Sequence, residues 1–139
     1  MKTERDYQNR AIVDKLGIKR GSVVAFAVEA QAVDVALQER ILLRTERPAA
    51  TGDEAVDVVL AVIDKNTDAY EVLRRWRLRL KPTGGIWLLT PKRDQSGYVK
   101  QEELIVAGQQ AGVVDNKVCS VSSTTSAMRF VIRKEDRPM

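Results

Sequence analysis

The sequence predicts an α/β domain in which helices cover both faces of a mostly parallel β-sheet of about six strands. Residues 55–90 carry the strongest signal, because an apolar run is followed by a helical pattern, a Pro/Gly-containing stretch and a second apolar run. This order is typical of a βαβ unit, in which a helix joins two parallel strands. Two alternating segments near the C-terminal end, separated by serines and threonines, predict an antiparallel hairpin that closes the sheet.

Composition restricts the class of protein. The 139 residues fit a single domain, with an ordered core over 7–134 and a flexible tail over 135–139. No apolar run approaches the ~20 residues that span a bilayer, the N-terminal residues lack the apolar segment of a signal peptide, and one cysteine excludes an internal disulfide. We therefore expect a cytoplasmic protein without membrane contact. Histidine is absent, and with it the commonest general base and metal ligand, so we predict no catalytic residue and no metal site.

The first half of the chain predicts two helices and two strands. Apolar residues at helical spacing between 7 and 16 predict a helix, and Gly17 fits its C-terminal cap. The next segments predict a strand buried on both faces, a helix and a short second strand, over residues 23–28, 31–39 and 41–43. The loop 46–54 is too short for a further strand and helix, but its extended length of about 30 Å could cross one strand. We therefore predict a sheet that lacks one βα unit.

The second half predicts two more parallel strands, two helices and the hairpin. Asp68 and Glu71 have the spacing of a capping box, which places the start of a helix inside the βαβ unit. The predicted strands cover residues 56–63, 86–90, 114–121 and 128–133, and the last predicted helix covers 99–111. We interpret residues 80–85 as a tight turn. The short second strand and the hairpin leave sheet edges exposed, where pairing between copies would give a homo-oligomer such as a homodimer.

Two strings in the βαβ unit resemble the second half of class I S-adenosylmethionine-dependent methyltransferases: Val-Asp-Val-Val-Leu at 56–60 and Leu-Lys-Pro-Thr-Gly-Gly at 80–85. Over residues 7–134 the chain is more closely similar to a family of short bacterial proteins of unknown function with the same fold. The strings that carry this second resemblance are Lys-Leu-Gly-Ile-Lys at 15–19, Pro-Lys at 91–92, Ser-Gly at 96–97, Lys-Val-Cys at 117–119 and Arg-Phe-Val at 129–131. The family pattern leads us to expect an aromatic residue in the hairpin loop. This chain departs from the pattern, because it has Thr124 and Thr125 there. The resemblance implies a three-layer, Rossmann-like fold of the methyltransferase type, and no established reaction.

The loop after the first strand decides whether a cofactor can bind. Rossmann-type sites place glycine there, so that backbone N–H groups can approach the ligand closely. Here the loop is Ala-Val-Glu-Ala-Gln-Ala at 27–32, and no glycine occurs between Gly21 and Gly52. Glu29 also places a negative charge near a helix N-terminus, where it stabilises the helix and repels phosphate. We therefore predict no bound cofactor and a pocket filled by side chains.

Five residues would line the crevice if cofactor binding had survived, namely Glu29, Ala30, Glu46, Asp64 and Lys92. Glu46 follows the predicted second strand, where an acidic residue would hold ribose hydroxyls. Asp64 and Lys92 follow the third and fourth strands, at the sheet edge where α/β proteins bind ligands. Alternatively, Asp64 caps the next helix and Lys92 belongs to a solvated loop. The leading function is thus a non-catalytic interaction or regulatory domain, and the alternative is an atypical methyltransferase that uses S-adenosylmethionine.

A basic run gives a third hypothesis, a nucleic-acid-binding accessory protein. It consists of Arg74, Arg75, Arg77, Arg79 and Lys81, in a chain of net charge +4. These cations alternate with apolar residues on a predicted helix, and aromatic residues for base stacking are scarce at 5%. The pattern therefore favours a solvated helix face over a nucleic-acid site. Cys119 lies in a predicted strand without any histidine to lower its pKa, which favours a buried apolar role over a nucleophilic one.

Overall fold

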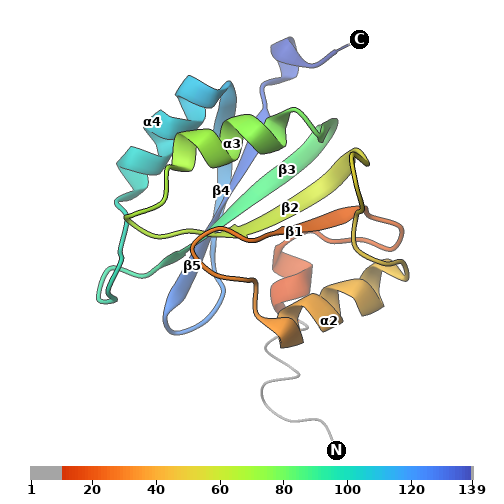
Figure 1. Cartoon of the computed structure of the whole chain (residues 1–139), viewed down its shortest axis with the longest axis horizontal. Coiled ribbons are helices and arrows are strands. Elements are labelled where there is room, and N and C mark those ends of the chain that lie inside the picture. The colour runs from red at the N-terminus through yellow and green to blue at the C-terminus, as the bar shows by residue number, and fades with distance from the viewer. Residues whose placement is uncertain (1–10, 139) are drawn as a thin grey trace, which may run out of the picture.

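The computed structural model describes residues 11–138 and has three layers, with one five-stranded sheet between helices on both faces (Figure 1). The strands are β1 (Val24–Ala27), β2 (Val56–Val62), β3 (Leu80–Pro91), β4 (Val113–Ser120) and β5 (Thr125–Ile132). The helices are α2 (Val35–Thr45), α3 (Ala69–Arg77) and α4 (Gln101–Ala111), together with helical residues 11–15 and a 3-10 turn at Lys134–Asp136. The start of the helix predicted over 7–16 lies outside the described residues. Its end has the expected cap, because Gly17 has a φ of 69°.

The strand order in the sheet is β1-β2-β3-β5-β4. β1, β2 and β3 pair in parallel, whereas β5 pairs antiparallel with both β3 and β4. The α/β class and the C-terminal hairpin are confirmed. The prediction of a mostly parallel sheet of about six strands is wrong, since the described sheet has five strands and two of its four pairings are antiparallel.

The predicted second strand over residues 41–43 is wrong, because these residues lie inside α2. Asp34 begins this helix by accepting a hydrogen bond from the backbone N–H of Leu37 (3.2 Å). Leu37, Ile41 and Thr45 recur at every fourth position and are all buried, which defines one helical stripe. A three-residue apolar run does not distinguish a strand from a buried helix face. As a result, α2 alone joins β1 to β2, and β1 is an edge strand.

Residues 80–85 form the first half of β3 instead of the predicted tight turn. This part of β3 pairs with the start of β2 across a register shift that is typical of a β-bulge. A Cβ on Gly84 would lie 2.8 Å from the backbone oxygen of Asp57, so only glycine lets the two strands approach this closely. Gly84, one of the two glycines that predicted a turn, therefore allows β2 and β3 to pack closely.

The start of α3 is confirmed as the capping pattern predicts. The Asp68 side chain accepts a hydrogen bond from the backbone N–H of Glu71 (3.1 Å), and the helix begins at the next residue after Asp68. The polar loop after β3 leads into α4, which ends at Gly112 in the left-handed conformation. Both helices run back over the same face of the sheet and pack side by side (Figure 1).

The sheet separates two apolar clusters. Phe130 is fully buried in the cluster beneath α3 and α4. Trp87 is fully buried in the cluster on the other face, which α2 and the helical residues 11–15 cover. The Trp87 indole N–H donates a hydrogen bond to the backbone oxygen of Leu16 (3.2 Å), which ties the end of the first helix to the middle of β3.

Candidate functional site

The carboxyl ends of β1, β2 and β3 lie at one edge of the sheet, where open α/β folds bind ligands (Figure 1). Four of the five candidate residues follow these strands directly: Glu29, Ala30, Asp64 and Lys92. Glu46 does not join them. It lies at the C-terminal end of α2, which runs opposite to the strands and ends at the other edge of the sheet.

The turn after β1 is tied to its neighbours by its own backbone and side chains. The backbone N–H of Ala30 donates to the backbone oxygen of Val62 at the end of β2 (3.0 Å), and Gln31 forms an isolated antiparallel bridge with Val62. The Glu29 carboxylate pairs with the guanidinium of Arg75 on α3 (2.8 Å), and the Glu29 side chain is only 14% exposed. The chain thus folds back across the end of β2, at the position where a glycine-rich cofactor loop would lie.

Glu46 has a structural role at the opposite edge. It caps α2 in the left-handed conformation with a φ of 57°, its backbone N–H donates to Leu42 (3.0 Å), and its carboxylate forms an ion pair with Arg20. We expected Glu46 to follow a second strand, in the position of an acidic residue that binds ribose hydroxyls. This expectation was wrong because residues 41–43 are helical, so they form no such strand. Within the described sheet, β1 therefore has no neighbour on its outer side.

Asp64 organises the turn between β2 and α3. One of its carboxylate oxygens accepts from the backbone N–H of Asn66 (2.9 Å) and from the Thr67 hydroxyl (3.2 Å). The helix cap itself is Asp68, four residues later. The next residue, Lys65, donates its backbone N–H to the Gly97 oxygen (3.0 Å), which joins this turn to the loop after β3.

Lys92 connects the loop after β3 to the hairpin. Its ammonium donates to the Ser120 hydroxyl (2.7 Å), and its backbone N–H donates to the Thr124 oxygen (2.9 Å). A groove of about 1080 Å³ lies beside it, between this loop and the start of α4. Its lining mixes cations and anions: Lys92, Arg93, Lys100, Asp94 and Glu102. This balance of charges favours no single class of ionic ligand.

A second groove was missed by the sequence reasoning. It has a volume of about 520 Å³ and lies between the first turns of α3 and α4, so we name it the α3–α4 groove. Tyr70 and Val106 line it and remain exposed to solvent. The sequence signal that could have indicated this groove is that these two apolar side chains fall outside the buried stripes of their helices. The groove shares Val99 and Glu102 with the larger groove, so the two form one continuous surface.

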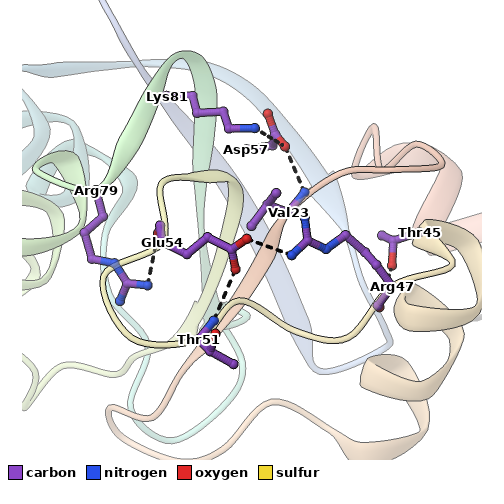
Figure 2. A network of polar contacts seen from close by, with 8 residues as sticks. All are labelled: Val23, Thr45, Arg47, Thr51, Glu54, Asp57, Arg79 and Lys81. Carbon is purple, nitrogen blue, oxygen red and sulfur yellow. Dashed lines mark hydrogen bonds and ion pairs between the residues drawn. The ribbon is translucent and has the colours of Figure 1, made fainter.

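The opposite edge of the sheet holds a polar network that fixes the connection between α2 and β2 (Figure 2). The Asp57 carboxylate accepts from the backbone N–H of Val23 (2.8 Å) and from the Lys81 ammonium (3.2 Å). Glu54 pairs with Arg47 (2.8 Å), and this hydrogen bond lowers the pKa of the Glu54 carboxyl. The Arg47–Glu54 pair thus holds the segment between α2 and β2, and Asp57 ties the start of β2 to the residue before β1 and to β3.

The basic run is largely neutralised within the chain. Arg74 pairs with Glu71 (2.6 Å), which lowers the pKa of that carboxyl, and Arg75 pairs with Glu29. The Arg79 guanidinium lies 4.8 Å from the centre of the Trp76 ring and donates to the Glu54 backbone oxygen, while Lys81 binds Asp57. Four of the five cations in the run are thus bound within the chain, so they do not form a free row for phosphates.

Cys119 is half-buried in β4, and burial raises the pKa of its thiol, despite the nearby ammonium groups of Lys15 and Lys117. A raised pKa leaves less thiolate at neutral pH. We expect alkylation of the folded protein by iodoacetamide at pH 8 to be at least about threefold slower than alkylation of the urea-unfolded chain. Mass spectrometry of timed samples measures both rates, and equal rates would contradict the expectation.

Two classes of site find no support among the described residues. No group of three or more Cys, Asp or Glu side chains within residues 11–138 is placed to hold a metal ion. Over the same residues, no helix is long and apolar enough to cross a membrane.

The fold and this edge define the class of protein as a methyltransferase-like α/β domain. Similar structures are a SAM-dependent methyltransferase from Aquifex aeolicus (TM-score 0.55, 12% identity, 90% of this chain and 89% of that chain) and the CcbJ methyltransferase from Streptomyces caelestis (TM-score 0.57, 9% identity, 91% and 89%). A TehB-like SAM-dependent methyltransferase from Corynebacterium glutamicum is similar to the same degree (TM-score 0.55, 11% identity, 90% and 88%). At these identities the likeness shows the fold alone.

The chain belongs to the family described as "Protein of unknown function (DUF3052)", whose model matches residues 13–134. The resemblance stated from the sequence strings is thereby confirmed, both for the family of unknown function and for the methyltransferase-like fold. No curated protein matches the chain in sequence.

Proposed function

We propose that the chain is a non-catalytic interaction or regulatory domain, which keeps the sheet of a methyltransferase without its cofactor site. The observation that carries this proposal is the closed turn after β1. Ala30 and Gln31 are bonded to the end of β2, and Glu29 is bonded to α3. A nucleoside would need these same backbone groups, and it would meet Cβ atoms where cofactor loops have glycine.

The edge position of β1 supports the same proposal. An acidic residue that holds ribose hydroxyls is normally supplied by a neighbouring strand. In this chain residues 41–43 belong to α2, which packs on a face of the sheet, so no described strand lies beside β1 on its outer side and Glu46 lies at the far edge. Of the remaining candidates, Asp64 is bonded within its own turn and Lys92 is bonded to Ser120 of β4. An atypical methyltransferase would have to rebuild all of these contacts before binding its cofactor.

Titration with S-adenosylmethionine tests the proposal. We expect no saturable heat in calorimetry and no change in Tm at about 1 mM ligand, because the backbone of the turn is already bonded to the end of β2 at Ala30 and Gln31. A site with a Kd of about 10 µM would instead stabilise the fold by about 2.7 kcal/mol at that concentration. Such a gain corresponds to a rise in Tm of roughly 5–10 °C for a domain of this size.

The matched control is the variant Arg75→Gln, which releases Glu29 from α3 without touching the turn itself. We expect it to fold and still not bind, because the Ala30–Val62 hydrogen bond remains. Saturable micromolar binding by the unmodified protein would refute the proposal and favour the methyltransferase alternative.

A further inference from the structure

The α3–α4 groove is apolar inside and acidic at its rim. Tyr70 and Val106 are 37% and 50% exposed along its walls, beside the partly buried Ala69 and Ala107. The charged side chains that line it are four carboxylates and one ammonium: Asp64, Asp68, Glu102, Glu103 and Lys65. This local excess of negative charge stands out on a chain whose net charge is +4. The groove therefore suits an apolar side chain with cations around it.

Two of the rim carboxylates are free to bind such cations. Asp64 and Asp68 accept hydrogen bonds from the turn before α3 and from the first turn of that helix. Glu102 and Glu103 are exposed and have no hydrogen-bond or ion-pair partner among residues 11–138. Their negative charges stabilise the N-terminus of α4, and both side chains are exposed to solvent.

The other end of the same helix carries the complementary chemistry. Leu78 directly follows α3 and is 74% exposed. Tyr70, Arg74 and Leu78 are spaced four residues apart, so they share one side of the helix. The side chains of Arg74 and Arg75 are 46% and 51% exposed despite their ion pairs. The exposed Leu78 thus lies one turn beyond Arg74 and Arg75, whose ion-paired guanidinium groups remain about half exposed.

We infer that α3 and α4 form a self-complementary face, on which a second copy of the chain docks antiparallel. Both helices begin at the carboxyl edge of the sheet (Figure 1), so the acidic groove between their first turns lies at one end of the face and Leu78 lies at the other. The nine residues of α3 separate the two ends by about 14 Å. A two-fold axis near the middle of α3 therefore brings each Leu78 to the partner's groove, and each contact is made twice.

The sheet edges are less suited to pairing between copies. The backbone N–H of Ala50 donates to the Val24 oxygen (2.8 Å), which covers part of the outer side of β1. β4, at the other edge, has a bulge between Asp115 and Lys117, and both of these residues are exposed. Bulges and charges protect an edge strand from further pairing. The helical face is therefore preferred over the edge pairing that the sequence suggested.

The inference rests on the proposed function, since it names the partner of an interaction domain as a second copy of the chain. Sedimentation equilibrium of the purified protein tests it. We expect a dimer whose dissociation constant lies at about 10–100 µM and increases with salt, because the paired charges are exposed. Leu78→Glu places a carboxylate against the acidic groove, and we expect it to raise the dissociation constant at least about tenfold.

Leu43→Glu is the matched control, because Leu43 is 67% exposed on α2, on the other face of the sheet. We expect this variant to dimerise like the unmodified protein. The double variant Glu102→Lys/Glu103→Lys reverses the charge at the rim, and we expect it to weaken the dimer as Leu78→Glu does. Circular dichroism verifies that each variant is folded.

Three results would overturn the inference: a monomer at about 200 µM, equal effects of the two leucine substitutions, or a dimer that Leu78→Glu leaves intact. A monomer would leave a partner of another kind as the occupant of the groove. None of these results changes the outcome of the S-adenosylmethionine titration, so failure of the dimer and failure of the proposed function are distinguishable.

Discussion

Replacing Trp87 by alanine is expected to lower the free energy of unfolding by about 3–5 kcal/mol. The Trp87 side chain is fully buried in the cluster beneath α2, so its removal leaves a cavity that the neighbouring β-strands cannot fill. The substitution also leaves the Leu16 oxygen without its indole donor, which frees the end of the first helix. Domains of this kind are stable by about 5–15 kcal/mol, so a large part of the total stability would be lost.

Urea denaturation followed by circular dichroism measures the change. Trp76→Ala is the matched control, because Trp76 lies at the surface of α3 and is only partly buried. We expect its cost to be clearly smaller, at about 1–2 kcal/mol. A loss below about 1 kcal/mol for Trp87→Ala would show that this residue does not hold the second cluster together.

Gly108→Ala is expected to destabilise the protein by about 1–3 kcal/mol, although the same change stabilises most helices by about 1 kcal/mol. A Cβ at this position of α4 would lie 2.6 Å from Cε1 and 2.8 Å from Cδ1 of Phe130. It would also lie 3.3 Å from the backbone oxygen of Val113. The Phe130 ring is fully buried on β5, so it cannot move aside without disturbing the cluster beneath α3 and α4.

A double-mutant cycle identifies the cause of that loss. Phe130→Leu removes ring atoms from the clash, so we expect Gly108→Ala to cost less in the Phe130→Leu background than in the unmodified protein. Gln109→Ala, one residue further along α4 and exposed, is the control and should change stability by less than about 0.5 kcal/mol. Strictly additive effects, or a stabilised Gly108→Ala variant, would refute the close packing of α4 on β5.

The sequence predicted those elements whose signals are local. The capping box at Asp68 and the alternation in the hairpin each depend on a few neighbouring residues, and both are confirmed. The prediction of a strand over residues 41–43 was wrong because a short apolar run fits a strand or a helix equally well. Only the burial of Leu37 and Thr45 decides between the two. The prediction of a turn over 80–85 was wrong because Gly84 serves the close approach of β2, which no local pattern reveals.

The candidate site was predicted in part for the same reason. Glu29, Asp64 and Lys92 were placed at one edge because parallel strands end together, and the structure shows them there. Glu46 was misplaced because its position depended on the strand that became part of α2. The bond between Ala30 and Val62 joins residues 32 positions apart, so the sequence gives no sign of it. The acidic rim of the α3–α4 groove likewise depends on two helices being adjacent.

Because β1 lies at the edge of the sheet, it is also where a further strand could be added. Any strand and helix inserted between α2 and β2 would add to the open margin of β1, while the order of the other strands stayed as it is. Only the segment around Ala50, which now occupies that margin, would have to give way. The outer side of β1 is therefore the place where this sheet could gain a strand without any change in the pairing of its other four strands.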